Sequence, residues 1–370
     1  MKDNIKLIEK SVTFFISSLG GGGAQNVCVT IANGLVNNGW NVTLLVMNLG
    51  DDRINLARLD KNIEVNDLQV KKARFLTFSL VKYFLNNNIK KIVCFDYELS
   101  IQTIIVNRVL NKKIKVISRN INSLKKLSES YNSFWRKYIV FNIIKMLYSK
   151  SDIVINQCQK MKLSLLQTVN IEQSKCKVIY NPIGDKYLTY KYKSSELSSQ
   201  EYLLCVGRLE KQKAFDLAIE AFSKVAQVKP NLRLKILGTG SELDKLKILA
   251  RSLNIAERVE FLGYVSDMGD YYDNAQCVLL TSLFEGFPNV LVESITFGTP
   301  IVSVDCESGP SEIVNDVNGI LVNYNNRENI YKSIIHVLDN KYKYNKQAIK
   351  IDSKRFNISN IIKNWESVLS

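Results

Sequence analysis

Histidine, proline and paired cysteines are scarce in this sequence. Its 370 residues include one histidine, His336, and five prolines, and none of the seven cysteines forms a C-x-x-C pair. The few prolines and the lack of low-complexity tracts leave little room for disordered segments. The odd number and scattered positions of the cysteines argue against a disulfide framework or a zinc site, and favour buried thiols in a reducing compartment.

Long hydrophobic runs are absent as well. The first apolar run, within MKDNIKLIEKSVTFFISSLGGGG, is too short and too interrupted for a transmembrane helix. It lacks a small-residue cleavage site and has acidic residues before it, so we expect no signal peptide. The sequence therefore predicts a cytoplasmic protein.

Acidic residues are outnumbered by basic ones. Fifty Lys and Arg against 35 Asp and Glu give a formal net charge of +15, which favours an anionic partner. The excess is concentrated in residues 70–91 and 124–150, where bases alternate with aromatic and aliphatic residues at roughly helical spacing. Such helices suit an anionic membrane surface, and equally a core-facing helix with solvated lysines. We expect no nucleic-acid partner, because no recognition-helix, zinc-finger or RNP-type pattern accompanies the charge.

Strand-length apolar runs alternate with helical patterns along the chain. In the first half we expect strands at residues 12–19, 41–48, 90–96, 114–120, 152–158 and 177–185. In the second half we expect strands at residues 201–209, 233–238, 259–265, 277–283 and 300–305, with helices between them. This alternation predicts an α/β protein with two doubly wound parallel sheets.

A polar stretch, KYLTYKYKSSELSSQ, divides the two halves. We place one Rossmann-like domain at residues 1–185, a linker at 186–200 and a second domain at 201–354, with a helix at 355–370 packing back on the first domain. Ligands bind beyond the carboxyl ends of parallel strands, so we expect the site in a cleft between two facing domains.

Four consecutive glycines, Gly20 to Gly23, end the first strand and open a helical pattern. Such a turn lets the backbone approach an anion at a helix N-terminus. The dinucleotide fingerprint is excluded, because Gln25 or Asn26 stands where G-x-G-x-x-G needs its last glycine, and no G-K-[ST] follows for a Walker motif. A flexible strand–helix turn that binds nothing explains the glycines as well.

Two motifs of the second half carry sharper signals. In VGRLEKQKAFD, Arg208 follows a strand and Lys213 precedes a helix, which suits a diphosphate clamp, although two solvated bases have the same pattern. In LFEGFPNVLVESITFGTP, Glu285 ends a strand, Pro288 suits the first helical position, and Glu293 lies among apolar residues of the helix. The helix N-terminus between the two glutamates can bind phosphate or sugar oxygens.

Together these segments resemble glycosyltransferase family 4, the retaining GT-B enzymes also described as glycosyl transferases group 1. The resemblance covers essentially the whole chain, through GGGAQNVCVTIANGL, YNPIG, VGRLEKQKAFDLAIEAF, ILGTGSELDKLK, VEFLGYV, EGFPNVLVES and SGPSEIV…NGILV. Glu285 and Glu293 match the family's E-x7-E signature. The resemblance implies a GT-B fold, with two Rossmann-like domains facing across a cleft.

The resemblance also implies roles. Arg208 and Lys213 would hold the donor diphosphate and offset charge on the leaving group. Glu285 and the amides near residues 287–289 would hold the donor sugar, and Glu293 would bind the ribose hydroxyls. Arg208, Lys213 and Glu285 are thus the expected catalytic residues. The expected donor-binding residues are Gly22, Gly23, Arg208, Lys213, Gly238, Gly240, Tyr264, Val265, Glu285, Gly286, Phe287, Pro288, Asn289, Val290 and Glu293.

The implied reaction is transfer from a nucleotide-sugar, expected to be a UDP-sugar, with retention of anomeric configuration. In the family's usual mechanism the acceptor attacks from the front face and the leaving phosphate takes its proton. No D-x-D triplet occurs in the chain, so we expect neither a metal nor another cofactor.

The acceptor is implied by a departure from the family. Many members have histidine at the end of the fourth strand, where this chain reads ISRNINS. Arg119 and Asn120 are the expected acceptor region, and subgroups with R-N there often act on polyprenyl-diphosphate-linked glycans. With the basic helices, this implies an undecaprenyl-diphosphate-linked acceptor, and a peripheral enzyme of O-antigen or capsule assembly at the cytoplasmic face of the inner membrane.

Two other functions stay open. A UDP-sugar 2-epimerase shares the architecture, but it relies on acid–base carboxylates and histidine, which this chain hardly supplies. An inactive sugar-nucleotide-binding scaffold is opposed by the intact Arg208, Lys213, Glu285 and Glu293.

Overall fold

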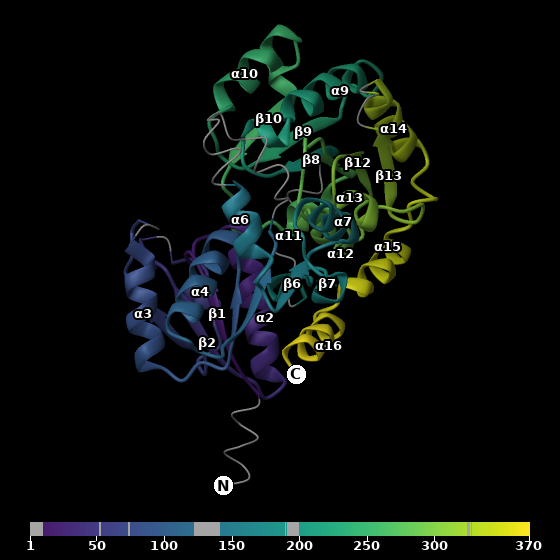
Figure 1. Ribbon diagram of the computed structural model, residues 1–370. Helices are drawn as coiled ribbons and strands as arrows, with labels where there is room; N and C mark the ends of the chain where they lie inside the picture. The colour runs from purple at the N-terminus through teal and green to yellow at the C-terminus, as the bar shows by residue number, and fades with distance from the viewer. Residues whose placement is uncertain are drawn as a thin grey trace. The chain divides into compact units, whose positions relative to one another are not determined.

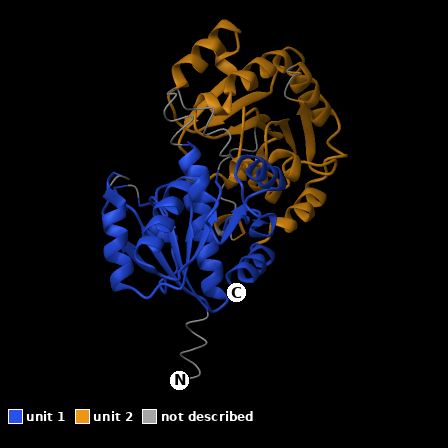
Figure 2. Ribbon diagram, viewed as in Figure 1, with its two compact units in different colours: residues 1–184, 358–370 blue, residues 185–357 orange. Residues whose placement is uncertain are grey.

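The computed structural model describes residues 10–51, 53–72, 75–121, 141–188, 190, 200–323, 326 and 328–370. The chain divides into two compact units: unit 1 is Met1–Gly184 with Ile358–Ser370, and unit 2 is Asp185–Asn357 (Figure 2). Most of the second basic segment, residues 124–140, lies outside the described residues.

The sheet of unit 1 has seven parallel strands in the order β3-β2-β1-β4-β5-β6-β7 (Figure 1). They are β1 Ser11–Ile16, β2 Asn41–Val46, β3 Glu64–Asp67, β4 Lys91–Cys94, β5 Lys115–Arg119, β6 Ile153–Asn156 and β7 Cys176–Val178. Phe14 and Phe15 of β1 enter different apolar clusters, as expected for a strand buried on both faces. The order reverses between β1 and β4, so the carboxyl ends of these strands form a topological switch point, where such sheets bind ligands.

Helices cover both faces of this sheet. They are α2 Gly23–Asn37, α3 Leu76–Asn86, α4 Tyr97–Val109, α6 Phe141–Tyr148, α7 Gln159–Thr168 and α16 Ile358–Leu369. The final helix α16 packs on α2. Its Trp365 ring is parallel to Phe95, with centroids 6.4 Å apart, and Glu366 accepts a hydrogen bond of 3.0 Å from Trp40 Nε1. The end of the chain therefore completes the core of the first unit.

Unit 2 has a six-stranded parallel sheet in the order β10-β9-β8-β11-β12-β13. The strands are β8 Tyr202–Val206, β9 Arg233–Leu237, β10 Val259–Gly263, β11 Cys277–Leu280, β12 Ile301–Asp305 and β13 Gly319–Asn323. The helices are α8 Asp185–Leu188, α9 Phe215–Val228, α10 Leu243–Ser252, α11 Gly269–Asn274, α12 Asn289–Thr296, α13 Pro310–Ile313, α14 Glu328–Asp339 and α15 Lys346–Ser353. The order reverses between β8 and β11, so this sheet also has a switch point at its carboxyl edge. Two doubly wound parallel sheets are thus confirmed.

Several boundaries differ from those expected. β7 ends at Val178, well before the expected end at residue 185. α12 begins at Asn289, with Pro288 as its N-cap residue. The edge strands β3 and β13 were not expected. The stretch expected as a linker begins with residues that pack on unit 2: Tyr187 is buried, and its ring centroid lies 5.7 Å from that of Phe297.

Candidate active site

Three loops at the carboxyl ends of β8, β9 and β10 are joined by backbone hydrogen bonds. Gly207 N donates to Leu237 O over 2.9 Å, and Gly238 N donates to Gly263 O over 2.7 Å. A Cβ on Gly238 would collide with the Gly207 carbonyl, and one on Gly240 with the Leu209 carbonyl. The glycines expected near the nucleotide are therefore required for the close approach of these loops. Tyr264 is exposed and Val265 is half-buried just after β10.

Lys213 and Glu285 meet at the switch point of unit 2. Lys213 ends the short 3-10 turn Lys211–Lys213 after β8, and its Nζ lies 2.6 Å from Oε1 of Glu285. The Ser282 hydroxyl donates to the same oxygen over 2.6 Å. Both charged side chains are largely shielded from water, with exposed fractions of 16% and 9%, so the attraction is stronger than for a surface pair. Arg208 lies exposed on the same loop.

The backbone around Lys213 is fixed on both sides. Gln212 Nε2 donates to Phe284 O over 2.9 Å, and Leu283 N donates to Gln212 O over 2.8 Å. Ala214, which stands where the family more often has glycine, takes the left-handed conformation with φ of 44°. This conformation is costly for a residue with a Cβ, and it lets α9 start directly after the lysine.

The segment from Gly286 to Val290 leads into α12. Gly286, Phe287 and Pro288 are buried, whereas Asn289 and Val290 are half-buried. The loop after β12 presses on this segment: Ser308 Oγ donates to Glu285 O over 2.7 Å, and a Cβ on Gly309 would collide with the ring of Pro288. The start of α12 is therefore held in place from a second strand end, as a binding site for oxygen atoms requires.

Glu293 lies about one turn into α12. The Tyr272 hydroxyl donates to its Oε2 over 2.7 Å. Burial raises the pKa of the Glu293 carboxyl above its usual range, while Lys186 and hydrogen bonds from Tyr272 and Tyr187 act in the opposite direction. The Tyr272 ring is itself fixed by Phe297, with nearly parallel planes and centroids 5.9 Å apart. A carboxylate held in this way can accept hydrogen bonds from hydroxyl groups.

Gly22 and Gly23 lie exposed at the start of α2 in unit 1. Gly22 has an ordinary φ of −73°, so its backbone does not require glycine. The preceding loop is held by Asn55, whose Nδ2 donates to Gly20 O over 2.5 Å. Arg58 donates to both Asn26 and Asn55, over 2.8 and 2.7 Å.

Arg119 and Asn120, at the end of β5, belong to a buried polar network. Arg119 Nη2 donates to Asn181 over 2.5 Å, and its guanidinium lies 5.1 Å from the ring centroid of Phe95. Burial lowers the pKa of Arg119 to about 10. The Asn120 carboxamide donates to Asn156 and accepts from Tyr148, over 2.7 and 2.5 Å. Direct contact of this pair with an acceptor stays a prediction.

Comparison with known proteins identifies the family of the second half of the chain. Residues 189–355 match the family model described as glycosyl transferases group 1. An N-acetylgalactosamine-N,N'-diacetylbacillosaminyl-diphospho-undecaprenol 4-alpha-N-acetylgalactosaminyltransferase of Campylobacter jejuni is 29% identical over 352 residues, covering 92% of this chain and 94% of that protein. The amylovoran biosynthesis glycosyltransferase AmsD of Erwinia amylovora is 23% identical, covering 94% and 96%. This segment belongs to the glycosyl transferases of group 1, and nearly the whole chain is similar to bacterial glycosyltransferases.

Solved structures show the fold of this glycosyltransferase. The lipopolysaccharide outer core galactosyltransferase WaaB in its apo form has a TM-score of 0.73 at 22% identity, covering 96% of this chain and 98% of that chain. Anabaena HepE in complex with UDP and glucose has a TM-score of 0.80 at 19% identity, covering 97% and 99%. The glycosyltransferase has the GT-B fold, as the sequence resemblance implied.

The sequence did not reveal several residues that hold the glycosyltransferase's candidate site. Ser282, Tyr272 and Ser308 contact Glu285 or Glu293, and only Ser308 lies in a segment with a recognisable motif. Asn156, Gln157 and Asn181 join Asn120 in the network of unit 1. We expected Asp96 to be the last residue of a strand. It instead lies two residues after β4 and caps α4, where its carboxylate accepts a hydrogen bond from Leu99 N over 2.8 Å.

Proposed function

We propose that this glycosyltransferase moves a hexose or N-acetylhexosamine from a UDP-sugar to a hydroxyl of a polyprenyl-diphosphate-linked glycan, with retention of configuration, in bacterial surface polysaccharide assembly. The observation that carries the proposal is the Lys213–Glu285 pair, followed about one turn into α12 by Glu293 with its Tyr272 partner. A cation, a sugar-facing carboxylate and a ribose-facing carboxylate at one sheet edge fit an elongated, diphosphate-containing donor.

In this proposal, Arg208 and Lys213 stabilise the charge that develops on the leaving diphosphate. Glu285 and the backbone amides at the start of α12 orient the donor sugar, with Pro288 unable to donate because it has no N–H. Glu293 accepts hydrogen bonds from the ribose hydroxyls. The acceptor oxygen attacks the anomeric carbon from the face that the diphosphate leaves, and a diphosphate oxygen takes its proton. The sole histidine lies exposed on α14, in line with a reaction that uses no imidazole base.

The proposed donor and acceptor are supported by the names of the relatives and by the charge of the chain. HepE is described in complex with UDP and with UDP-glucose. The Campylobacter enzyme is named for a diphospho-undecaprenol-linked acceptor and an alpha linkage. A net charge of +15 suits both substrates, since each carries phosphate groups. We propose that basic side chains and helix amides bind the donor diphosphate without a metal, because the sequence has no D-x-D triplet.

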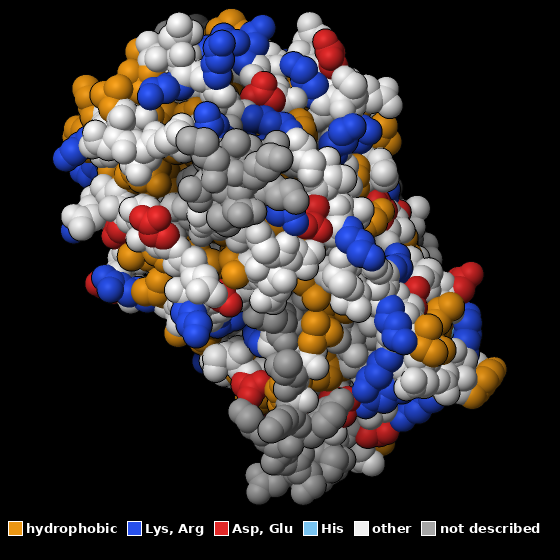
Figure 3. All heavy atoms as spheres, turned by 90° about the horizontal axis from the view of Figure 1, so that it is seen from below, with side chains coloured by type: hydrophobic (Ala, Val, Ile, Leu, Met, Phe, Trp, Pro, Cys, Tyr) orange, Lys and Arg blue, Asp and Glu red, His pale blue; other side chains and the backbone are white. Residues whose placement is uncertain are grey.

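We also propose that the enzyme docks on the cytoplasmic face of the inner membrane through α3. One face of α3 is buried through Leu76, Leu80 and Phe84, whereas Phe78 and Leu85 are 78% and 59% exposed on the other side, beside the exposed Lys82. On the face seen in Figure 3, blue Lys and Arg side chains lie beside exposed hydrophobic ones. Within the described residues, none of the helices has the length and apolar character needed to span a bilayer.

The test is incubation of the purified protein with UDP-sugars and an undecaprenyl-diphosphate-linked sugar acceptor, with and without EDTA. We expect UDP release that depends on the acceptor and survives EDTA, and a product with the donor's anomeric configuration by NMR. An inverted linkage would contradict the retaining mechanism, and loss of activity with EDTA would contradict metal independence. If none of the UDP-sugars led to UDP release, the result would contradict the proposed donor.

A further inference from the structure

A second concave site lies at the opposite edge of the unit 1 sheet. It has a volume of about 420 Å³ and is lined by the last turns of α4, the loop into β5, the start of β5 and the segment before β6. Lys115 begins β5 and Arg119 ends it, so this pocket is about 13 Å away from the carboxyl edge, where Arg119 and Asn120 lie. The pocket therefore lies apart from Arg119 and Asn120, the expected acceptor region of unit 1.

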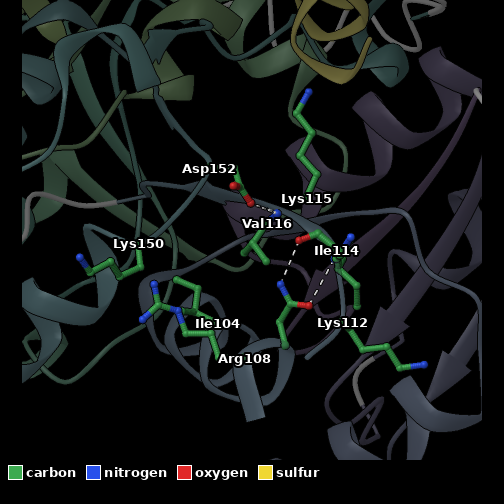
Figure 4. A pocket seen from close by; sticks show the side chains of 10 residues that line it. Ile104, Arg108, Lys112, Ile114, Lys115, Val116, Lys150 and Asp152 are labelled. Atoms are coloured by element: carbon green, nitrogen blue, oxygen red, sulfur yellow. Dashed lines mark hydrogen bonds between the residues drawn. The ribbon is translucent and has the colours of Figure 1, made fainter. Parts of the chain in front are cut away.

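Five basic side chains surround this pocket: Arg108, Lys112, Lys113, Lys115 and Lys150. Figure 4 shows Arg108 and Lys150 on one side of the pocket and Lys112 on the other, with Lys115 extending toward α16. The one acidic lining residue is Asp152, whose Oδ2 accepts from Val116 N over 2.7 Å. Lys115 Nζ donates to Val368 O over 3.0 Å. In the described part of the chain, none of the five cations has a carboxylate within ion-pair distance.

Negative partial charges at helix C-termini offset only part of the positive charge around the pocket. α4 ends at Val109 and α6 ends at Tyr148, and each helix C-terminus has a partial charge of about −0.5. Together with the Asp152 carboxylate they offset about two of the five positive charges, which leaves about +3 around one pocket. Lysines that only interact with solvent are not expected to cluster, from three separate segments, around one pocket.

The pocket wall is fixed before any ligand binds. Asn107 Nδ2 donates to Ile114 O over 3.0 Å, and Asn107 Oδ1 accepts from Ile114 N over 3.3 Å (Figure 4). These two bonds tie the end of α4 to the start of β5 and hold the loop that carries Lys112 and Lys113. The floor includes Ile114 and Val116, which are buried. Because this backbone is already held in place, binding an anion has to order only the cationic side chains.

We propose that this pocket binds a phosphate group carrying two or more negative charges, on either a soluble metabolite or an anionic lipid. The guanidinium of Arg108 suits two phosphate oxygens at once, and the lysines act as point charges around it. Such a ligand replaces the repulsion among the five cations by charge-assisted hydrogen bonds. The site does not depend on the donor or the acceptor of the transfer reaction.

Hydrogen–deuterium exchange of residues 105–116 tests this site directly, because it reports on this segment alone and not on Arg208 or Lys213. The soluble probe is inorganic diphosphate. The membrane probe is phosphatidylcholine vesicles with phosphatidic acid, whose phosphate monoester can carry two negative charges, compared with phosphatidylcholine alone. We expect slower exchange with diphosphate if the phosphate comes from a metabolite, or only with anionic vesicles if it comes from a lipid. Unchanged exchange with both probes overturns the proposal.

Arg108→Gln/Lys150→Gln removes one cation from each of two segments. We expect the apparent Kd of the effective probe to rise about tenfold or more, since each charge-assisted bond contributes at least about a factor of ten. Lys61→Gln/Lys177→Gln is the matched control, because both lysines are exposed and neither lines the pocket. Equal weakening in both variants overturns the site. If thermal unfolding shows that Arg108→Gln/Lys150→Gln has a folding defect, Lys112→Gln/Lys113→Gln, on the exposed loop, is tested in its place.

Discussion

Lys213 and Glu285 join the loops that follow β8 and β11, with Nζ and Oε1 2.6 Å apart and the Ser282 hydroxyl on the same carboxylate oxygen. The two residues are 72 positions apart in the chain. Their strands are neighbours in the sheet, and the sheet reverses its order between them. The pair therefore places a cation where parallel α/β sheets bind ligands.

Lys213→Ala removes the cation from this pair. We expect kcat to fall about 10²–10³-fold, because a charge that stabilises the leaving diphosphate is lost. We also expect the free energy of unfolding to fall by about 3 kcal/mol, because Glu285 stays buried without its counter-ion. Nucleotide release and thermal unfolding measure the two effects. Lys211→Ala, exposed in the same turn, is the control, and unchanged kcat in folded Lys213→Ala would remove Lys213 from the site.

Substitutions at Gly238 and Gly22 distinguish a glycine that is required for folding from one that is required for activity. Gly238 has a φ of 138° and no room for a Cβ beside Gly207 O, so we expect Gly238→Ala to lower the free energy of unfolding by about 2–4 kcal/mol. A Cβ on Gly22 meets only the flexible Gln25 side chain. Gly22→Val should therefore fold normally and lose turnover, if this edge approaches the donor. Normal turnover with an unfolding midpoint like that of the wild type would contradict the role of Gly22.

Tyr272→Phe isolates the hydrogen bond to Glu293. The Tyr272 hydroxyl lowers the pKa of this buried carboxyl, so its loss raises the pKa further. Ribose hydroxyls donate to the ionised carboxylate, so we expect the acid limb of kcat/KM for the donor to move to higher pH, with kcat at high pH little changed. The pH profile of UDP release measures the shift. Tyr271→Phe, next in the chain and half-buried, is the control, and an acid limb that stays in place would contradict the assignment.

The apolar runs and turn glycines made the strands predictable, because a parallel strand buried on both faces reads as a continuous apolar run. The edge strand β3 was missed for the same reason, because Glu-Val-Asn-Asp has no apolar run. The edge strand β13 does have a short apolar run, but it follows a helix of only four residues, and the sequence pattern predicts the end of that helical segment instead. Glu285 and Glu293 could be found because their spacing is local.

Their partners could not be found from local spacing. Tyr272 is 21 positions from Glu293, and Asn120 is 36 positions from Asn156. These pairs form only when strand order brings the loops together, and a lone tyrosine or asparagine has no periodic pattern that marks it in advance. The same holds for the basic pocket, where Lys150 joins Arg108 through the neighbouring starts of β5 and β6.

Phe78→Gln/Leu85→Gln tests whether α3 enters a membrane surface. Both side chains are exposed, so we expect little change in stability, and we expect binding to phosphatidylglycerol vesicles to fall about tenfold because two apolar groups no longer insert. Flotation with anionic and neutral vesicles measures the bound fraction. Val228→Gln/Ile248→Gln removes two equally exposed apolar groups from unit 2 and should leave binding unchanged. Equal recovery of wild type and the α3 variant would contradict docking through α3.

Asp96→Asn tests a carboxyl at the switch point of unit 1. Burial raises the pKa of Asp96 to about 6, against about 3.9 in an unfolded chain. The folded protein thus binds this proton more tightly, so the stabilising contribution of Asp96 is complete below about pH 4 and is lost as pH rises through about 6. Asparagine is an equally good N-cap for α4 and does not ionise. We expect the variant and wild type to unfold alike at low pH.

Above pH 6, Asp96→Asn should be more stable than wild type by about 2–3 kcal/mol, the free energy of a shift of about two pKa units. Urea unfolding between pH 4 and pH 8 measures this difference. Asp244→Asn, exposed in the first turn of α10, controls for the loss of one negative charge and should follow the wild-type curve. Parallel curves for wild type and Asp96→Asn would mean that Asp96 keeps an ordinary pKa, because only a carboxyl that titrates differently in the folded and unfolded states makes stability depend on pH.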